Sequence, residues 1–366
     1  MNDVNVPHGV FKEDNKFVAY VNGVKVYSAR MKEHAEKHFN RALKNNPELT
    51  LVQKKQVKEI PVEPVAVETR STSAHIPTAD PGFIPFGEFK IIDKVIKSGQ
   101  FFPVFITGPS GNGKSTMVEQ SCARNKRSYI RFQVSKDTDE EQLIGSKTLV
   151  NGNIQIVEGP VLIAMRTGSI LLLDEISIAQ PDSLMALQTI LEGKPYYFKL
   201  KDEIVKPAPG FNIIATDNTK GRGSDTGRYI GTKILNEAFL ERFAITLEQE
   251  YPSQAVELKI ITKAMEKFNC MDEEFAKTLV KWADAIRRTY DDGAIDDLIT
   301  TRRLLQIVQT YSIFGDKKKS VELACNRFDT LTKASFIEVF EKIDPTDAVV
   351  EQNETPVENK TQTPAD

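Results

Sequence analysis

The sequence predicts an α/β domain, in which a mostly parallel sheet is flanked by helices, followed by an all-helical domain and preceded by a small module of three strands and a helix. Short apolar runs at 104–106, 169–173 and 211–215 are typical of buried strands. From residue 251 onward, apolar side chains recur at helical spacing. Between residues 9 and 27, two turn dipeptides separate three alternating runs, a pattern that favours hairpins.

Composition limits the class of protein. The 366 residues suffice for two or three domains, and the net charge of −3 argues against nucleic acid as an obligatory partner of the whole chain, although a local basic patch is compatible with it. The 3 cysteines are far apart and form no CxxC, as in reduced compartments. The first ten residues lack a basic region followed by an apolar core, so we expect no signal peptide, and no apolar run approaches the roughly 20 residues of a membrane helix. We expect a cytoplasmic protein.

Shifts in composition suggest five segments. Residues 1–46 form the strand and helix module, with Asn22-Gly23 as a hairpin turn. Residues 47–75 contain proline and polar residues without periodicity, as flexible linkers do. The α/β core then covers 76–250, the helical region 251–344 is expected to act as a lid, and the polar segment 345–366 is expected to be disordered.

One glycine-rich motif lies at the centre of the predicted core: Gly108-Pro109-Ser110-Gly111-Asn112-Gly113-Lys114-Ser115. It fits G-x-x-x-x-G-K-[S/T], the phosphate-binding P-loop, and it has a strand before it and a helix after it. Glycines let such a loop curl until its N–H groups converge on phosphate oxygens, and the helix N-terminus adds further donors. The alternative is a glycine-rich turn without a ligand, which this context disfavours.

The motif assigns a role to each polar side chain. Lys114 is expected to reach the β- and γ-phosphates, and the Ser115 hydroxyl is expected to ligate Mg²⁺. Thr116 is expected near the α-phosphate. The predicted ligands are therefore ATP and Mg²⁺, with Gly108 to Thr116 as the cradle.

Two later strands bring polar residues to their carboxyl ends, the edge where ligands lie in open α/β sheets. The run Ser169–Glu175 ends in two acids: Asp174 is expected to hold Mg²⁺, and Glu175 to orient and deprotonate the attacking water. The strand 211–216 leads to Asn218, whose amide either holds that water or simply caps a turn. Both interpretations of Asn218 are open.

The remaining core elements follow from periodicity and turn signals. We expect helices at 88–97, 115–124, 139–143, 161–165, 181–192 and 233–241, and hairpins at 146–157 and 196–206. The helix 88–97 and the segment before it are placed to close over the adenine. In the helical region, Phe275, Leu279, Trp282 and Ile286 form a core stripe, and Thr300 is expected to cap a helix.

Together these parts resemble AAA+ ATPases, in particular the MoxR and chelatase branch and, within it, the CobS subunit of cobaltochelatase. The resemblance covers about residues 76–310. Its residues are Ile76-Pro77, Asp80-Pro81, Ala215-Thr-Asp-Asn-Thr219, Gly221, Gly223, Asp225-Thr-Gly227, Tyr229, Gly231-Thr232, Leu235-Asn236 and Glu241-Arg-Phe243.

The resemblance implies further roles. Asn218 becomes the sensor asparagine, and Arg242 an arginine finger that acts on a neighbour's ATP. Arg302 takes the place of a second sensor arginine, with the adjacent Arg303 as its competitor. The hairpins would face the pore of a ring of six subunits and grip a partner.

The resemblance also implies partners: a CobT-like protein with a von Willebrand A domain and a large chelatase subunit. The N-terminal module departs from the CobS pattern and suggests a phage-type relative, which would act in the host cytoplasm. That module resembles the DNA-binding arms of phage integrases in the order of its elements, and a protein-docking module is the favoured alternative; the first interpretation makes a DNA-associated AAA+ motor one alternative function. A MoxR-like chaperone without a chelatase role is another.

Overall fold

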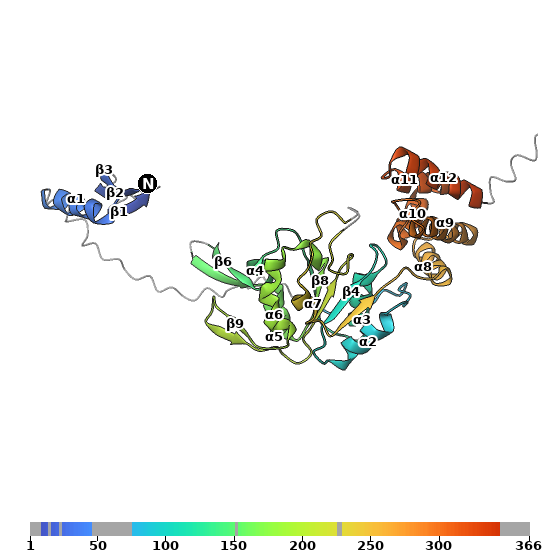
Figure 1. The fold of residues 1–366 in the computed structure, drawn as a ribbon, viewed down its shortest axis with the longest axis horizontal. Helices are drawn as coiled ribbons and strands as arrows, with labels where there is room; N and C mark the ends of the chain where they lie inside the picture. The colour runs from blue at the N-terminus through green and yellow to red at the C-terminus, as the bar shows by residue number, and fades with distance from the viewer. Residues whose placement is uncertain are drawn as a thin grey trace, which may run out of the picture. The chain divides into compact units, whose positions relative to one another are not determined.

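The computed structural model describes residues 9–13, 16–21, 24–45, 75–150, 153–224 and 229–344. The chain divides into two compact units, Met1–Glu68 and Thr69–Asp366, whose elements are drawn in Figure 1. The predicted turns at 14–15, 22–23 and 151–152, the linker up to residue 74, residues 225–228 and the tail from 345 lie outside the described residues. The five predicted segment boundaries stay predictions.

The first unit contains an antiparallel sheet in the order β1-β2-β3, with Gly9–Glu13 as β1, Lys16–Val21 as β2 and Val24–Ala29 as β3. Helix α1 (Lys32–Asn45) packs on it. Val18 and Ala35 are buried, and the Tyr27 ring stacks on His38 with centroids 3.7 Å apart. The expected three strands and one helix are therefore confirmed.

The second unit is built on a parallel five-stranded sheet in the order β12-β4-β11-β8-β5. These strands are β4 (Val104–Thr107), β5 (Tyr129–Gln133), β8 (Ile170–Asp174), β11 (Asn212–Thr216) and β12 (Ile245–Glu248). Every residue of β4, β8 and β11 is buried, because helices cover both faces of the sheet. The predicted α/β fold is confirmed.

Side-chain alternation along the strands divides the interior around the sheet into two cores. On β8, Ile170 and Leu172 pack in one cluster with helices α2 (Phe89–Ser98) and α3 (Lys114–Arg124). Leu171 and Leu173 pack in the other, which includes α5 (Pro160–Thr167). The P-loop helix α3 and the helix before the P-loop therefore share one face of the sheet.

Short helical segments and two hairpins also belong to the core. The hairpins are β6 (Gly145–Val150) with β7 (Asn153–Glu158), and β9 (Tyr196–Phe198) with β10 (Glu203–Val205). The short helical segments are α4 (Glu140–Leu143), η2 (Ile176–Ile178) and the pair η3 (Pro181–Leu187) and α6 (Gln188–Leu191). The region predicted as one α-helix from 181 to 192 thus starts as a 3₁₀ helix. With three residues per turn, Leu184 and Leu187 fall on one face, and both are buried.

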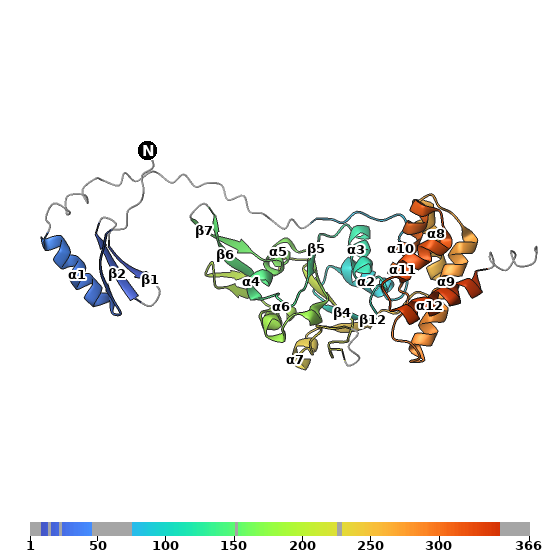
Figure 2. The same cartoon turned by 90° about the horizontal axis from the view of Figure 1, so that it is seen from above.

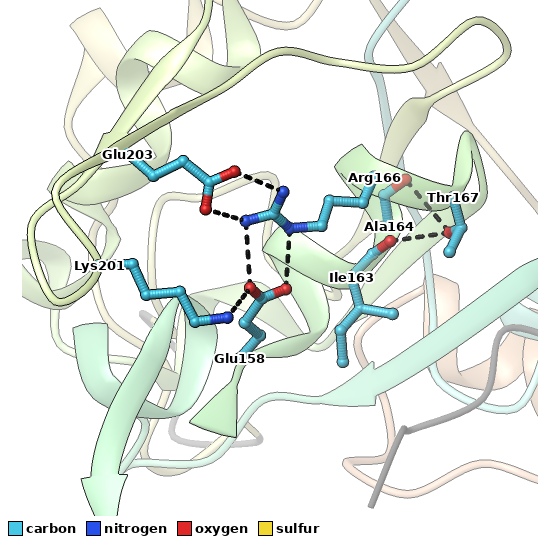
Figure 3. Close-up of polar contacts among 7 residues, drawn as sticks. All are labelled: Glu158, Ile163, Ala164, Arg166, Thr167, Lys201 and Glu203. Carbon is cyan, nitrogen blue, oxygen red and sulfur yellow. Dashed lines mark hydrogen bonds and ion pairs between the residues drawn. The ribbon is translucent and has the colours of Figure 1, made fainter. Parts of the chain in front are cut away.

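An ionic cluster joins the two hairpins through α5 (Figure 3). The Arg166 guanidinium donates to Glu158 Oε2 at 2.9 Å and to Glu203 Oε2 at 2.7 Å, and Lys201 Nζ donates to Glu158 Oε1 at 2.7 Å. Burial opposes ionisation of Glu158, but the hydrogen bonds from Lys201 and Arg166 outweigh it and lower its pKa. Residues far apart in the sequence thereby tie both hairpins to one helix.

The lid consists of α8 (Gln254–Lys267), α9 (Glu273–Asp291), α10 (Thr301–Phe314), α11 (Lys317–Cys325) and α12 (Thr330–Ile343). Figure 2 shows these helices grouped together on the side of α2 and α3. The predicted apolar stripe of α9 is buried: Phe275, Leu279, Trp282 and Ile286. Within it, Trp282 Nε1 donates to Phe336 O at 2.8 Å. Thr300 is the N-cap of α10, as predicted, and its hydroxyl accepts from the Arg303 amide at 3.1 Å.

Between the core and the lid, one expectation is wrong and one strand was missed. The helix predicted at 233–241 is only α7 (Glu237–Leu240), since Asn236 caps it and the Lys233 and Leu235 amides donate to Ser177 and Gly221 instead. Strand β12 was not predicted. Within the described residues, none of the helices combines the length and the apolar character that crossing a bilayer requires.

Candidate nucleotide site

The P-loop backbone takes conformations that require glycine. Gly108, Gly111 and Gly113 have φ values of 139°, 71° and 89°. A Cβ on Gly108 would lie 2.0 Å from the carbonyl oxygen of Gln249, and one on Gly111 would lie 2.9 Å from Thr300 Cβ. Larger residues would therefore displace the loop from both β12 and the lid.

Lys114 lies at the first position of α3, and its ammonium points back under the loop. Its Nζ donates to the carbonyl oxygens of Gly108 at 2.7 Å and Pro109 at 2.9 Å, and to Asn218 Oδ1 at 2.8 Å. A weaker contact joins it to Asn112 Oδ1 at 3.4 Å, while Asn112 Nδ2 donates to Gln249 O. The structure thus brings Lys114 and Asn218, predicted from separate motifs, into direct contact.

Burial gives this lysine an unusual protonation equilibrium. The pKa of Lys114 falls to about 8, because removal from water disfavours the ammonium more than Asp217, Asp174 and Glu175 stabilise it. The positive charge of Arg302 lowers this pKa further. An anion bound in the loop would stabilise the Lys114 ammonium and so raise the pKa of this lysine.

Asp174 and Ser115 form the centre of the predicted metal site. Ser115 Oγ donates to Asp174 Oδ1 at 2.8 Å, the Thr216 hydroxyl donates to the same oxygen, and the Arg131 guanidinium donates to Oδ2. A hydroxyl beside a buried carboxylate is the all-oxygen donor set that Mg²⁺ prefers. The residues present therefore fit this ion.

Glu175 follows directly in a left-handed conformation, with φ 60° and ψ 48°. Its amide donates to Thr216 Oγ1 at 3.0 Å, and its carboxylate accepts from Gln133 Nε2 at 3.0 Å. The turn at 175 separates this carboxylate from that of Asp174, so the two acids have different partners. This difference is compatible with the separate roles predicted for them, Asp174 with a metal ion and Glu175 with the attacking water.

The sequence left open whether Asn218 holds the attacking water or caps a turn, and the contacts of its neighbour Asp217 bear on this question. Asp217 Oδ2 accepts from the amides of Thr219 at 2.8 Å and Gly221 at 2.7 Å, so the aspartate caps the turn. The Asn218 side chain accepts from Lys114 instead. This geometry favours a role for Asn218 in the nucleotide site.

A cavity of about 400 Å³ lies between the P-loop, the segment before α2 and the lid. This volume is within the range of small-molecule sites. Arg302 lines it, Arg303 is not among its lining residues, and the Arg302 amide donates to Gly111 O at 3.2 Å. The lining includes Asp80, Phe83, Ile84, Phe86, Gly111, Asn112, Gly113, Thr116, Met117, Gln249, Ile260, Lys263, Arg302 and Leu305. The mixture of apolar, polar and cationic groups suits a purine nucleoside joined to phosphates.

Arg242 is the one predicted catalytic residue that the structure does not bring to this site. It follows α7, where its Nε donates to Glu192 Oε1 at 3.1 Å and its Nη1 donates to Ala238 O. Its side chain is 25% exposed. Arg242 therefore has its hydrogen-bond partners away from Lys114 and the two acids.

Sequence reasoning missed several polar residues of the site, among them Arg131, Gln133, Thr216 and Asp217. Arg131 and Gln133 occupy alternate positions of β5 and contact the two consecutive acids of the neighbouring strand. Alternation in 129–133 could have indicated a polar face. Which acid each side chain meets depends on the register between β5 and β8.

Comparison with known proteins agrees with this geometry. A family model described as AAA domain (dynein-related subfamily) matches residues 103–243. The chain is 26% identical over 276 residues to the aerobic cobaltochelatase subunit CobS of a Sinorhizobium species, covering 74% of this chain and 83% of that protein. It is 32% identical over 212 residues to an uncharacterized protein of Staphylococcus epidermidis, covering 55% and 74%.

Among solved structures, the Holliday junction branch migration motor RuvB of Thermotoga maritima is 15% identical, with 69% of this chain and 67% of that chain covered and a TM-score of 0.39. The matched family region contains both strands that end in the predicted acids and sensor, together with the P-loop. The chain therefore belongs to the AAA family of ATPases, in its dynein-related subfamily, and is related to the CobS subunit of cobaltochelatase.

Proposed function

We propose that this ATPase hydrolyses ATP with Mg²⁺ at a site shared between neighbouring subunits of a six-membered ring, and uses the reaction to remodel a protein partner. The observation that carries the proposal is the joint placement of Lys114, Ser115, Asp174 and Glu175 at one edge of the sheet. These are the groups that phosphoryl transfer requires: a cation, a metal site and a base.

Each residue has a defined task in this reaction. Lys114 holds the β- and γ-phosphates, and Asn218 positions its ammonium. Glu175 orients the attacking water and accepts its proton, while Gln133 holds that carboxylate. Mg²⁺, held by Ser115 and Asp174, would neutralise phosphate charge as the γ-phosphoryl group leaves. Arg302, at the cavity wall, contributes a cation from the lid.

The position of Arg242 is the argument for the ring. Transition-state charge on the γ-phosphoryl group needs a further cation, and such arginines contribute about 10³–10⁵ in rate. Arg242 has its hydrogen-bond partners outside its own nucleotide site, at Glu192 and Ala238. We assign it to the site of the adjacent subunit, as the resemblance to CobS implies.

The two hairpins are the proposed contact with the partner. Each carries an exposed apolar pair directly across its strands: Leu149 opposite Ile154, and Tyr197 opposite Ile204. Such side chains at hairpin surfaces can hold a polypeptide. By relation to CobS, the partner is a CobT-like protein with a von Willebrand A domain, with a large chelatase subunit as a further member; a MoxR-like chaperone would engage another client through the same hairpins.

The substitution Glu175→Gln tests the proposal, because it keeps the nucleotide site and removes the base. With ATP and Mg²⁺, we expect a stable hexamer in sedimentation velocity and a loss of hydrolysis of at least about 100-fold. The loaded hexamer should retain a purified CobT-like protein, and Lys114→Ala should abolish both assembly and retention. Hydrolysis at the wild-type rate in either variant would contradict the mechanism, and a monomer under all nucleotide conditions would contradict the ring.

A second candidate, a DNA-associated motor, is favoured by the charge of the first module. Residues 9–45 contain eight lysines and arginines against four acids, although the whole chain carries a net charge of −3. Basic modules bind phosphate backbones in a salt-dependent way. Binding of duplex DNA that weakens with salt and disappears on deletion of residues 1–50 would support this candidate, and equal binding by both forms would exclude the module as the anchor.

A further inference from the structure

Two consecutive carbonyl groups of the P-loop are held from the lid side. Tyr251 lies between β12 and α8 along the chain, and its hydroxyl donates to Ser110 O at 2.8 Å. The Arg302 amide donates to Gly111 O at 3.2 Å, and the missing Gly111 side chain leaves room for Thr300. The loop that is to bind phosphate is therefore in direct contact with the first residues of two lid segments.

A buried ion pair lies behind Tyr251. The Arg287 guanidinium is 4.2 Å from the centroid of the Tyr251 ring and donates two hydrogen bonds of 2.9 Å to the Glu257 carboxylate. Its Nε donates to Ile299 O at 2.8 Å, and Thr301 Oγ1 donates to Glu257 Oε1 at 2.5 Å. The pair thus joins α8, α9 and the start of α10 beneath one tyrosine.

By itself, the Arg287–Glu257 pair is expected to contribute little to the free energy of unfolding. The side chains of Glu257 and Arg287 are 1% and 11% exposed, so both lose most of their hydration on folding. The attraction between buried charges often only offsets that loss, and apolar residues of similar size can replace such pairs without cost. The pair does, however, fix the plane and position of the Tyr251 ring, through a cation–π contact and a rigid bidentate geometry.

We propose that Tyr251, held by the Arg287–Glu257 pair, is a positioning residue that couples the P-loop to the lid. By fixing the peptide of Ser110, it holds the loop in the conformation in which its amides can converge on phosphate, so that nucleotide affinity depends on a lid contact. Any change of the loop on binding passes through Tyr251 to the three joined helices. The inference rests on the nucleotide site proposed above and adds residues to it.

The test compares two Tyr→Phe substitutions that each remove one hydroxyl. Tyr251→Phe keeps the ring on Arg287 and loses the bond to Ser110. Tyr311→Phe is the matched control in the lid, where the Tyr311 hydroxyl donates to Asp272 Oδ2 at 3.4 Å. The Kd of a fluorescent ATP analogue, the KM and kcat of hydrolysis, and the melting temperature are measured for both variants and the wild type.

For Tyr251→Phe we expect Kd and KM to rise about threefold to tenfold, the effect of one lost hydrogen bond, with kcat within about twofold of wild type. Tyr311→Phe should leave Kd unchanged. In hydrogen exchange, nucleotide should slow the amides of 251–258 and 299–305 in the wild type, and this slowing should be reduced in Tyr251→Phe. Arg287→Lys, which keeps a cation but loses the two-pronged contact, should raise Kd in the same direction and serves where the tyrosine variant fails to fold.

The possible outcomes distinguish a failure of the proposed coupling from a failure of the proposed nucleotide site on which it rests. A wild-type protein that binds no ATP analogue would overturn the nucleotide site itself. A wild type that binds it, together with Tyr251→Phe and Arg287→Lys variants of unchanged Kd and unchanged lid protection, would overturn only the coupling. A lower melting temperature without a change in Kd or KM would assign the three residues to stability alone.

Discussion

The low pKa of Lys114 makes nucleotide binding depend on pH in a defined direction. Without an anion in the loop, the ammonium loses its proton around pH 8. A bound triphosphate stabilises the charged form and raises this pKa, so binding takes up a proton whenever Lys114 is neutral beforehand. Affinity is therefore full well below pH 8, where Lys114 is charged beforehand, and it falls as the pH rises through and above 8.

The size of the effect follows from the protonated fraction. With a pKa of about 8, the charged fraction is about 0.76 at pH 7.5 and about 0.09 at pH 9, so the Kd for ATP should rise about eightfold between them. At pH 8.5 each binding event should take up about 0.8 protons. An unperturbed lysine, with a pKa near 10.4, would show neither effect over this range.

Titration calorimetry in two buffers of different ionisation enthalpy measures the Kd and the proton uptake together. Lys114→Gln is the matched control: it binds more weakly, but its Kd should be constant from pH 7.5 to 9. A wild-type Kd that is also constant across this range, or a Lys114→Gln variant with the same slope as the wild type, would refute the assignment to Lys114.

Three further predictions concern other parts of the molecule. Arg242→Ala should bind ATP with unchanged Kd but hydrolyse it about 10³-fold more slowly, and mixing it with Glu175→Gln subunits, which still assemble, should restore part of the rate, since each supplies what the other lacks; absence of rescue in mixed assemblies would argue against a shared site. Arg166→Gln should speed amide exchange in β10 while leaving the Kd for ATP unchanged, because it breaks both ionic contacts between the hairpins and α5; equal exchange in variant and wild type would show that the cluster does not hold them. Trp282→Ala should lower the free energy of unfolding by about 3–5 kcal/mol in urea titrations followed by circular dichroism, since it empties a fully buried site in the lid, and a loss below about 1 kcal/mol would contradict the packing described.

The sequence was sufficient for the parts of the site that local chemistry determines. The P-loop motif, the acids at the end of β8 and the N-cap Thr300 each depend on a few adjacent residues, and the structure shows the elements expected around them. The helical stripe through Trp282 depends only on periodicity, which persists over the 19 residues of α9. How these side chains act in the reaction stays a prediction.

Contacts between distant segments could not be derived in the same way. Strand β12 has four residues, of which only Leu247 is buried, and it is defined mainly by its pairing with β4. The partners of Asp174 come from α3, β5 and β11, and the Tyr251 hydroxyl that donates to Ser110 O comes from a loop more than 100 residues away. Such contacts depend on strand order and register, which no local pattern encodes.

The backbone at Glu175 has a consequence for the chain's tolerance of mutation. A residue with a Cβ in the left-handed region has a free-energy cost of roughly 1–2 kcal/mol that glycine does not have. Replacement by glycine should therefore strengthen the fold while it removes the proposed base. Screens for thermal tolerance would select inactive proteins at this position, whereas screens for turnover would retain the strained side chain.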